Sequence, residues 1–358
     1  MSFSLYVDED RWRGHMSSVV SSSPGLAPVI KGNGYGLGLG RLAAEAGSLG
    51  VDTVAVGTSD ELSPVREHFS GDVLVMTPSF PRPEPDPSGQ VIRTVSHVSA
   101  LRGAAGARVV LEAMTTMRRH GIGAAELADA ARELPGVRLE GVAFHLPIDR
   151  QGGYDPALEV ATWLERFGAA DVPTDVAWVS HLTESELGTL HAQFPATTFR
   201  PRIGTALWLG DRDALVARGT VLDVHPLERG EHYGYRRRRA LRDSHLLVVA
   251  GGTAHGVALE APRVARGPVG RGKALAVGTL AAANLSLSPF RWAGHQRWFA
   301  EPPHMHVSLV LLPASVAPPR IGDELDCDVR LTTIHPDRVA PLPAAGGGMG
   351  VDHGGPGR

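Results

Sequence analysis

Short apolar segments alternate with amphipathic ones along the first part of the chain. Brief runs rich in β-branched residues are typical of buried strands, whereas apolar positions three and four residues apart are typical of one face of a helix. Helical spacing recurs at 41–48, 124–134, 156–167 and 184–193. The strands predicted around these helices are Ala27–Ile30, Thr53–Gly57, Val73–Met76, Val91–Val95, Arg108–Glu112, Leu139–His145, Val176–Ser180 and Thr197–Arg200.

Strands that alternate with helices are typical of α/β folds with a parallel sheet. We expect a (β/α)8 barrel over residues 1–212, although the periodicity alone fits an open α/β sheet nearly as well. Beyond residue 212 turn residues separate β-like runs, which predicts a smaller, mainly β C-terminal domain over 213–340. Residues 341–358 are rich in glycine and proline, so we expect a disordered tail. The strands expected in the second domain are Thr220–Val224, Leu246–Val249, Lys273–Val277, Met305–Leu312 and Asp326–Leu331.

Composition and charge narrow the classes of function. The chain has 358 residues, of which 43% are hydrophobic, so it can bury a large core. A net charge of −3 gives no reason to expect nucleic acid or an anionic membrane as a partner, and the run Arg236–Arg239 is more typical of a solvated face. The single cysteine, Cys327, excludes an intrachain disulfide and suits a reducing compartment. Because no signal-peptide pattern and no apolar run of ~18–20 residues is present, we expect a cytoplasmic protein.

A lysine ends the first predicted strand of the barrel. Lys31 follows the apolar run Pro28–Ile30 and opens a turn with glycines at 32, 34 and 36. A lysine at the end of a buried strand is costly unless it is paired or neutral. One way to make it neutral is a Schiff base with an aldehyde cofactor, chiefly pyridoxal 5'-phosphate (PLP). The alternative is a surface lysine that opens a loop, and the pattern alone leaves both open.

The segment Lys31-Gly32-Asn33-Gly34-Tyr35-Gly36 resembles the Lys-Ala-Asn-Ala-Tyr-Gly motif of alanine racemases and their fold-type III PLP relatives, in which the lysine carries the cofactor. The resemblance implies that Lys31 holds PLP and acts as an acid/base group, and that Tyr35 reaches the cofactor phosphate. It implies a homodimer with sites shared between subunits. The implied reaction is racemisation or epimerisation of a small amino acid, by proton exchange at Cα.

Further segments of the barrel domain are similar to the same family. Met117-Arg118-Arg119-His120-Gly121 resembles a family segment whose arginine contacts the phenolic oxygen of the cofactor and the substrate carboxylate. This implies that role for Arg119, with Arg118 as the alternative register. Glu112 stands where many alanine racemases carry a carbamylated lysine, and its carboxylate could hold Arg119 in place. His145 matches a histidine that supports the arginine facing the pyridine ring.

The last predicted barrel strand runs into Arg202-Ile-Gly204-Thr205-Ala-Leu-Trp-Leu-Gly, which resembles the family's Arg-x-Gly-Ile-Ala-Leu-Tyr-Gly. The resemblance implies that Arg202 faces the pyridine nitrogen and that the Gly204 and Thr205 amides bind the phosphate. Arginine does not readily give up a proton, so the ring nitrogen would stay unprotonated and the cofactor would be a poorer electron sink. That favours proton exchange at Cα over a lyase or decarboxylase reaction. The family also has Asn-Ser near Ser180, so the hydroxyl of Ser180, Thr183 or Ser185 is expected at the phosphate.

Toward the C-terminus the chain departs from the family. The family's Gly-Tyr-Ala-Asp-Gly, whose tyrosine is the second acid/base group, appears as Gly252-Thr253-Ala254-His255-Gly256. A threonine hydroxyl is far too weak an acid to replace a phenol with a pKa of ~10. We therefore expect His255 to be the second catalytic residue, with an ordinary polar loop residue as the alternative. The family's Cys-Met-Asp-Gln appears as His304-Met305-His306-Val307, and the Met305 amide is expected to bind the substrate carboxylate.

Two other functions stay open at this point. A PLP-binding protein without strong turnover fits the loss of the tyrosine at Thr253. A PLP-dependent lyase or decarboxylase fits the same architecture, although Arg202 counts against it. His304 and His306 could ligate a metal, but no further ligands cluster with them in the sequence, so no metal is expected.

Overall fold

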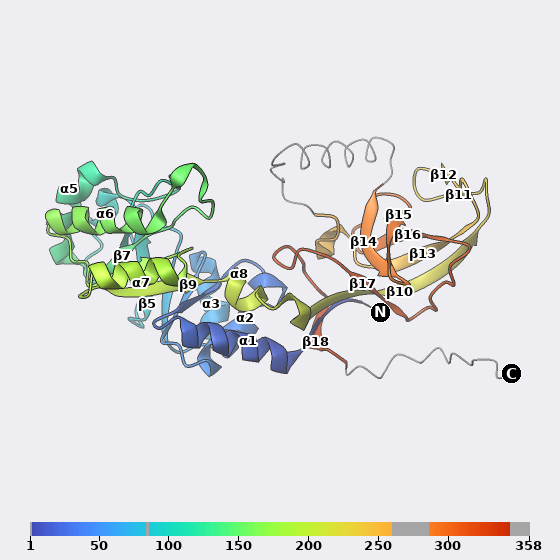
Figure 1. Cartoon of the computed structure of the whole chain (residues 1–358), viewed down its shortest axis with the longest axis horizontal. Coiled ribbons are helices and arrows are strands. Elements are labelled where there is room, and N and C mark those ends of the chain that lie inside the picture. Colours follow the sequence, from blue (N-terminus) through green and yellow to red (C-terminus); the bar gives the residue numbers. More distant parts are fainter. Residues whose placement is uncertain (1, 84–85, 260–285, 344–358) are drawn as a thin grey trace. The chain divides into compact units, whose positions relative to one another are not determined.

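The computed structural model describes residues 2–83, 86–259 and 286–343, and the eight predicted strands form a closed parallel barrel (Figure 1). The first barrel strand pairs with the last, where Ala27 lies opposite Arg202 and Pro28 opposite Ile203. This pairing closes the ring, so the barrel is confirmed and the open-sheet alternative is wrong. The strands are β2 (Ala27–Ile30), β3 (Thr53–Val56), β4 (Asp72–Val75), β5 (Val91–Val95), β6 (Arg108–Glu112), β7 (Arg138–Ala143), β8 (Val176–Val179) and β9 (Thr198–Ile203).

Every second residue of the barrel strands faces the interior. Successive side chains of a strand point to opposite faces, so the inward set repeats with a period of two. Val29 of β2, Val110 of β6 and Trp178 of β8 belong to one buried inner cluster. The Trp178 indole N–H donates to the carbonyl oxygen of Glu140 at 2.9 Å, which satisfies its polar atom inside the barrel. The inward positions that follow this cluster lie at the carboxyl ends of the strands, at the mouth of the barrel.

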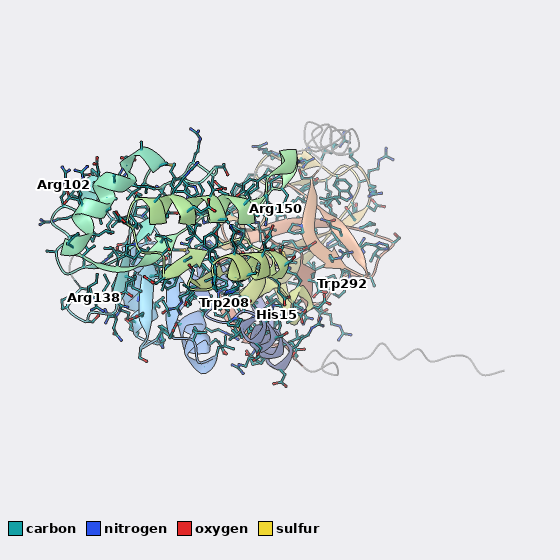
Figure 2. All side chains as sticks on the ribbon, turned by 60° about the vertical axis from the view of Figure 1, so that its left-hand side comes forward. His15, Arg102, Arg138, Arg150, Trp208 and Trp292 are labelled. Atoms are coloured by element: carbon teal, nitrogen blue, oxygen red, sulfur yellow. The ribbon has the colours of Figure 1, made fainter. Side chains whose placement is uncertain are left out.

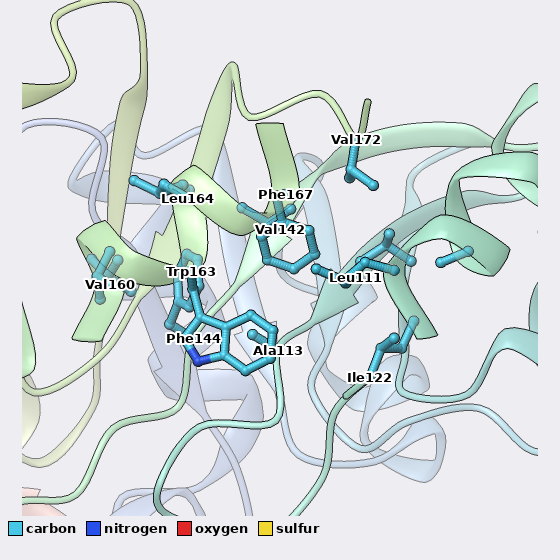
Figure 3. Close-up of a cluster of buried hydrophobic side chains, with 14 of the residues drawn as sticks. Leu111, Ala113, Ile122, Val142, Phe144, Val160, Trp163, Leu164, Phe167 and Val172 are labelled. Carbon is cyan, nitrogen blue, oxygen red and sulfur yellow. The ribbon is translucent and has the colours of Figure 1, made fainter. Parts of the chain in front are cut away.

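Helices pack on the outward faces of the strands. Leu111 and Val142 from β6 and β7 form one cluster with Trp163 and Phe167 of α6 (Figure 3). α6 begins after Asp155, whose Oδ1 accepts the Ala157 N–H at 2.9 Å. The helices are α1 (Glu9–Ser22), α2 (Leu39–Ser48), α3 (Leu62–Arg66), α4 (Val98–Leu101), α5 (Leu127–Glu133), α6 (Pro156–Ala169), α7 (Glu184–Gln193) and α8 (Thr205–Leu209). Short 3-10 turns are η1 (Gly34–Gly36), η2 (Ser59–Glu61), η3 (Ala124–Glu126), η4 (Leu134–Gly136), η5 (Gln151–Gly153), η6 (Arg212–Ala214) and η7 (Thr253–His255).

One predicted helix is interrupted. The segment 124–134 consists of η3, α5 and the start of η4 rather than of one helix. The Glu126 side chain reaches back and accepts the Gly123 N–H at 2.9 Å, which tightens the first turn. Pro135 follows at the other end and has no N–H with which to continue an α-helix.

The second body of the chain is a mainly antiparallel sheet, as predicted. Its strands follow the order β13-β16-β15-β14-β17-β10-β1-β18, and β13 also pairs with β10. The strands are β1 (Phe3–Val7), β10 (Leu215–Leu227), β13 (Ser244–Ala250), β14 (Leu287–Trp292), β15 (His295–Phe299), β16 (Val307–Pro313), β17 (Glu324–Cys327) and β18 (Arg338–Pro341). A separate ribbon consists of β11 (His232–Tyr233) and β12 (Arg238–Arg239).

The chain divides into two units after Gly210, close to the expected boundary at 212. We call residues 14–34 and 38–210 the barrel unit, and residues 2–13, 35–37, 211–259 and 286–343 the β unit. Residues 2–13 belong to the β unit and not to the barrel domain, because β1 pairs with β10 and β18. The last expected strand ends at Cys327 instead of Leu331.

The C-terminal expectations are tested only in part. The expected disordered tail begins too early, because Pro341 is part of β18 and the Leu342 N–H donates to the carbonyl oxygen of Val7 at 2.7 Å. The predicted strand Lys273–Val277 and residues 344–358 of the tail lie outside the described residues. None of the helices in the described ranges is long and apolar enough to cross a membrane.

Candidate active site

Along several barrel strands, the predicted site residue comes two positions after a residue of the buried inner cluster. Lys31 comes two residues after Val29, and Glu112 two residues after Val110. By the same alternation His145, Ser180 and Arg202 occupy inward positions at the ends of β7, β8 and β9. In a (β/α)8 barrel the carboxyl ends of the strands carry the functional side chains. The period of the strands therefore explains why polar groups gather at this mouth.

Glu61 ties the backbone directly after Lys31 to the end of the neighbouring strand β3, and the sequence analysis missed it. Its carboxylate accepts the Gly32 N–H at 2.6 Å, the Gly57 N–H at 2.6 Å and the Thr58 N–H at 3.2 Å. A Cβ on Gly57 would lie 3.3 Å from the Lys31 Cβ and 3.0 Å from a Glu61 carboxylate oxygen, so glycine leaves room for this contact. The signal was the Thr58-x-x-Glu61 spacing directly after β3, which is typical of a capping box.

The pKa of Lys31 is lowered. Partial burial is the main cause, and the positive charges of Arg119 and Arg202 add to it, whereas the negative charge of Glu61 opposes it. The side chain itself is accessible to solvent, as is that of Arg119. A lysine with a lowered pKa carries more neutral amine near pH 7 than an ordinary lysine does. The mouth therefore holds an amine suited to attack an aldehyde or to take a proton.

Arg202 and Glu112 are both buried, and the charge of each affects the pKa of the other. Arg202 is 6% exposed and its Nη2 donates to the carbonyl oxygen of Phe144 at 2.9 Å. Burial lowers the pKa of Arg202, and the negative charge of Glu112 opposes this decrease. Burial raises the pKa of Glu112, and the positive charges of Arg202 and Arg119 oppose this increase. Two buried atoms, Nε of Arg202 and Oε2 of Glu112, have no hydrogen-bond partner among the described residues. Buried polar atoms are normally satisfied, so these two mark space for a ligand or water.

Two histidines stand next to these cations. Burial, Arg119, Arg202, His181 and Lys31 lower the pKa of His145 to about 3, so its ring is neutral near pH 7. His181, which the sequence analysis did not single out, lies with its ring centroid 5.5 Å from that of His145. Its backbone has φ of 59°, rarely adopted by residues other than glycine, and Arg150 (labelled in Figure 2) donates to its carbonyl oxygen at 2.6 Å.

Two of the three hydroxyls expected at the phosphate, those of Ser180 and Thr183, have hydrogen-bond partners in the chain. The Ser180 hydroxyl donates to the carbonyl oxygen of Phe144 at 3.2 Å and accepts the Leu146 N–H at 3.3 Å, and it lies 3.4 Å from His145 Nδ1. Thr183 is the N-cap of α7. Ser185 lies in the exposed first turn of that helix. Their predicted role, and that of Gly204 and Thr205 at the start of α8, stays a prediction.

The remaining predicted residues belong to the β unit. Tyr35 is 5% exposed and Met305 66% exposed, and their roles also stay predictions. His255 is 6% exposed, and both of its ring nitrogens are engaged: Nδ1 accepts the Gly252 N–H at 3.1 Å, and Nε2 lies 3.2 Å from Asp337 Oδ1. Such a ring is held in place rather than presented to a substrate. This geometry weakens the expectation that His255 is an acid/base group.

A second histidine of the β unit, His304, contacts the described residues through only one of its ring nitrogens. His304 Nε2 lies 2.7 Å from Oε1 of Glu301, a carboxylate of a residue that is 3% exposed. Tyr235 covers the imidazole with a ring centroid distance of 4.5 Å. A Cβ on Gly234 would lie 2.3 Å from Glu301 Oε2, so glycine is required for this approach. The missed signal was Glu301 three residues before the His304-x-His306 pair. Within the ranges that the structure covers, no group of three or more His, Cys, Asp or Glu could hold a metal.

A closed (β/α)8 barrel followed by a mainly β unit, with a lysine at the end of the first barrel strand, defines the class of fold-type III PLP enzymes to which the sequence is similar. The chain belongs to the family described as alanine racemase, N-terminal domain, which matches residues 7–210. The alanine racemase of Nitratidesulfovibrio vulgaris (strain Hildenborough) is 27% identical over 282 residues, which cover 70% of this chain and 72% of the relative.

Solved structures of alanine racemases share the fold. The enzyme of Streptomyces lavendulae superposes with a TM-score of 0.65 at 21% identity, covering 91% of this chain and 87% of the other. The Clostridium difficile 630 protein gives 0.68 at 15% identity, with 94% and 92% covered. The Bartonella henselae structure, which has covalently bound pyridoxal phosphate, gives 0.67 at 16% identity, with 91% and 90% covered. The similarity extends over both units of this chain.

Proposed function

We propose that this protein is an isomerase, a PLP-dependent racemase or epimerase of a small amino acid. The observation that carries the proposal is Lys31, whose pKa is lowered by partial burial and by two neighbouring arginines at the barrel mouth. An amine activated in this way is a good nucleophile toward an aldehyde and a good base once it is free. Membership of the alanine racemase family supports the same reaction.

The residues at the mouth fit PLP. The cofactor phosphate and an amino-acid carboxylate are both anions, and Lys31, Arg119 and Arg202 make this region cationic. Arg202 also has a buried Nε–H without a partner among the described residues, which suits a ring nitrogen as acceptor. When bound, PLP would withdraw electrons from Cα of the amino acid and make the Cα proton acidic.

Each residue of the mouth has a role in this proposal. Lys31 holds the cofactor and moves one proton at Cα. Arg202 donates to the ring nitrogen without giving up its proton, and Glu112 balances its charge. Arg119 binds the substrate carboxylate. The Gly204 and Thr205 amides bind the phosphate, since the hydroxyls of Ser180 and Thr183 are already hydrogen-bonded within the chain.

We propose His304, rather than His255, as the second proton-transfer group. One group cannot reach both faces of a planar carbon without reorientation, so a second is needed. The His304 carbonyl oxygen accepts the Thr253 N–H at 2.9 Å, which puts His304 beside the position of the family's tyrosine. Buried Glu301 orients the His304 ring and leaves Nδ1 for proton transfer, the arrangement by which a carboxylate sets the tautomer of a catalytic histidine.

The assembly and location are also proposals. The β unit carries His304 and the barrel unit carries Lys31, and the resemblance to alanine racemases implies that such groups meet across two subunits. We propose a homodimer on this ground. A single cysteine, which is buried, suits a reducing compartment such as the cytoplasm.

The test is exchange of the Cα proton in deuterium oxide. Purified protein with PLP is incubated separately with each enantiomer of alanine, serine and other small amino acids, and deuterium at Cα and enantiomeric purity are followed. Racemisation with deuterium in both enantiomers would support the proposal. Uptake of PLP without exchange for any amino acid would favour the binding-only alternative. Release of carbon dioxide or loss of the side chain would favour a decarboxylase or lyase.

A further inference from the structure

A groove in the β unit is lined by none of the residues assigned to the proposed reaction. Its volume is about 720 Å³, which is within the ~300–1,000 Å³ typical of small-molecule sites. Strands β13, β15 and β16 and the β11–β12 ribbon contribute its walls. Leu227, Trp298, Phe299, Leu311 and Leu312 make much of the surface apolar.

One wall of the groove contains a buried arginine. Arg297 is 7% exposed, and its Nε and Nη2 donate to the carbonyl oxygen of Trp292 at 3.1 and 2.6 Å (Trp292 is labelled in Figure 2). Nη1 makes no hydrogen bond to a described residue, and it is not one of the buried atoms closed off from solvent, so a ligand can reach it. No carboxylate among the described residues forms an ion pair with Arg297. Burial lowers its pKa, and no acidic group opposes the shift. A largely buried guanidinium that has no counter-charge and one accessible nitrogen is suited to bind an anion.

Other arginines of this chain, unlike Arg297, have acidic neighbours among the described residues. Arg108 lies on the barrel with 13% of its side chain exposed, and it forms ion pairs with Asp72 at 2.6 Å and Glu140 at 2.7 Å. Arg202, at the candidate active site, shares burial and a lowered pKa with Arg297. However, Arg202 has the charge of Glu112 nearby, whereas no Asp or Glu is among the described residues that line the groove.

The same groove accounts for part of the arginine run. Arg239 of β12 and Arg242 line it, and neither forms an ion pair with a described residue. Both are exposed, so they can attract an anion from solution but bind it weakly by themselves. Leu241, between them in the chain, is 84% exposed at the groove. A hydrophobic side chain flanked by cations suits a ligand with an apolar body and a negative group.

We propose that this groove binds a small amphipathic anion, an organic carboxylate or phosphate whose apolar body packs on Phe299 and the leucines while its charged group reaches Nη1 of Arg297. The pairing of an apolar wall with one buried cation gives both halves of such a ligand a partner. A purely apolar compound would leave the guanidinium unpaired, and a purely polar ion would leave the apolar wall in water.

The test uses the PLP-loaded protein and the fluorescence of 1-anilinonaphthalene-8-sulfonate, an apolar aromatic anion. We expect saturable binding that Arg297→Gln weakens ~10-fold or more, because a charge-assisted contact is lost in a dry site. Arg291→Gln is the matched control: Arg291 is exposed on β14, does not line the groove, and should not change binding. Excess alanine should not displace the probe, which separates this site from the proposed active site. Displacement by decanoate and by decyl phosphate would show whether a carboxylate or a phosphate is preferred.

N-Phenyl-1-naphthylamine, which has the same aromatic body without a charge, sharpens the outcome. Its binding should be weak and unaffected by Arg297→Gln. Equal binding of the anionic probe by wild type and Arg297→Gln, with both folded by circular dichroism, would overturn the proposal. If Arg297→Gln does not fold, Leu241→Asp carries the test: a negative charge at an exposed position should weaken the anionic probe ~10-fold and spare the neutral one. No difference between the two probes would again overturn it.

Discussion

The histidines of the barrel mouth and those of the β unit have opposite electrostatic neighbours. His145 is partly buried beside three cationic side chains, which lower its pKa to about 3. His304 has a buried carboxylate, Glu301, at 2.7 Å from Nε2. The first environment keeps a ring uncharged, so that it can only donate or accept a hydrogen bond. The second orients a ring for proton transfer. This difference agrees with our proposal that the barrel binds substrate and cofactor and that the β unit supplies the second proton-transfer group.

The largest effect on activity is expected from Lys31→Ala, which removes the amine at the barrel mouth. Activity should fall by ~1,000-fold or more, because the residue is both cofactor anchor and base. Lys31 and Lys273 are the only two lysines in the sequence, which makes labelling unambiguous. Wild type with PLP should absorb near ~420 nm, and borohydride should attach the cofactor to Lys31. Lys273→Ala is the matched control and should be labelled normally; label on Lys273 alone would contradict the assignment.

His304→Ala should remove the second proton-transfer group that we propose in the β unit. Removal of a general base typically costs ~100- to 10,000-fold. Because one group serves each face of Cα, deuterium exchange should fall far more from one enantiomer than from the other. His306→Ala, at an exposed position two residues further along the loop, is the control and should have little effect. Mixed subunits carrying Lys31→Ala and His304→Ala should recover some activity if sites are shared. An equal, small loss for both enantiomers would reject His304, and His255→Ala and Tyr235→Phe would then be tested in the same assay.

Arg119→Gln removes one positive charge from the barrel mouth and tests its effect on Lys31. Arg119 lowers the pKa of Lys31, so its loss should raise that pKa. Less neutral amine is then present near pH 7, and the rate of PLP uptake should fall by ~10-fold and recover as the pH is raised. Stopped-flow absorbance between pH 6 and 10 measures both effects. Arg118→Gln is the register control. A pH profile shifted by Arg118→Gln and not by Arg119→Gln would exchange their roles.

The smallest effect is expected from His145→Asn. An ordinary histidine has a pKa of ~6.5, and His145 in the folded protein has one of about 3, so the unfolded chain binds more protons in this window. The contribution of His145 to stability is therefore full above ~6.5 and decreases as the pH falls toward 3. Asparagine removes this term, and the midpoint of acid unfolding should move down by less than about one pH unit. His191→Asn, on α7 outside the barrel mouth, is the control. An unchanged acid transition would show that His145 does not contribute.

The sequence was sufficient to identify candidate site residues at the carboxyl ends of the predicted barrel strands. Lys31 and Glu112 could be singled out because each ends a predicted buried strand, and Arg202 because its segment resembles a family motif; the structure puts all three on the inward side of the barrel strands. The barrel was predicted, but the periodicity alone did not distinguish it from an open sheet, because closure depends on the pairing of β2 with β9, which are far apart in the chain. The β1 strand was missed for the same reason, since its partner residues lie more than 200 positions away.

The parts of the site that were missed depend on side chains brought together by tertiary structure. Glu61 binds backbone N–H groups on two strands, and Glu301 becomes the partner of His304 only when the loop around Gly234 is in place. The burial of His255 was also invisible, because Asp337 reaches it from 82 residues away. A local pattern identifies which residues can do chemistry, but not which of their atoms are already engaged.

The position of β1 has a consequence for synthesis on the ribosome. Phe3 lies opposite Gly219, and Ser4 opposite Arg338, so this strand is made long before either neighbour exists. At ~5–20 residues per second its first partner emerges on the order of ten seconds or more later, by which time the whole barrel has left the tunnel. Until then β1 presents a bare apolar edge that invites pairing with other nascent chains. Cells that make this protein in quantity should therefore keep the segment covered by a chaperone until β10 arrives.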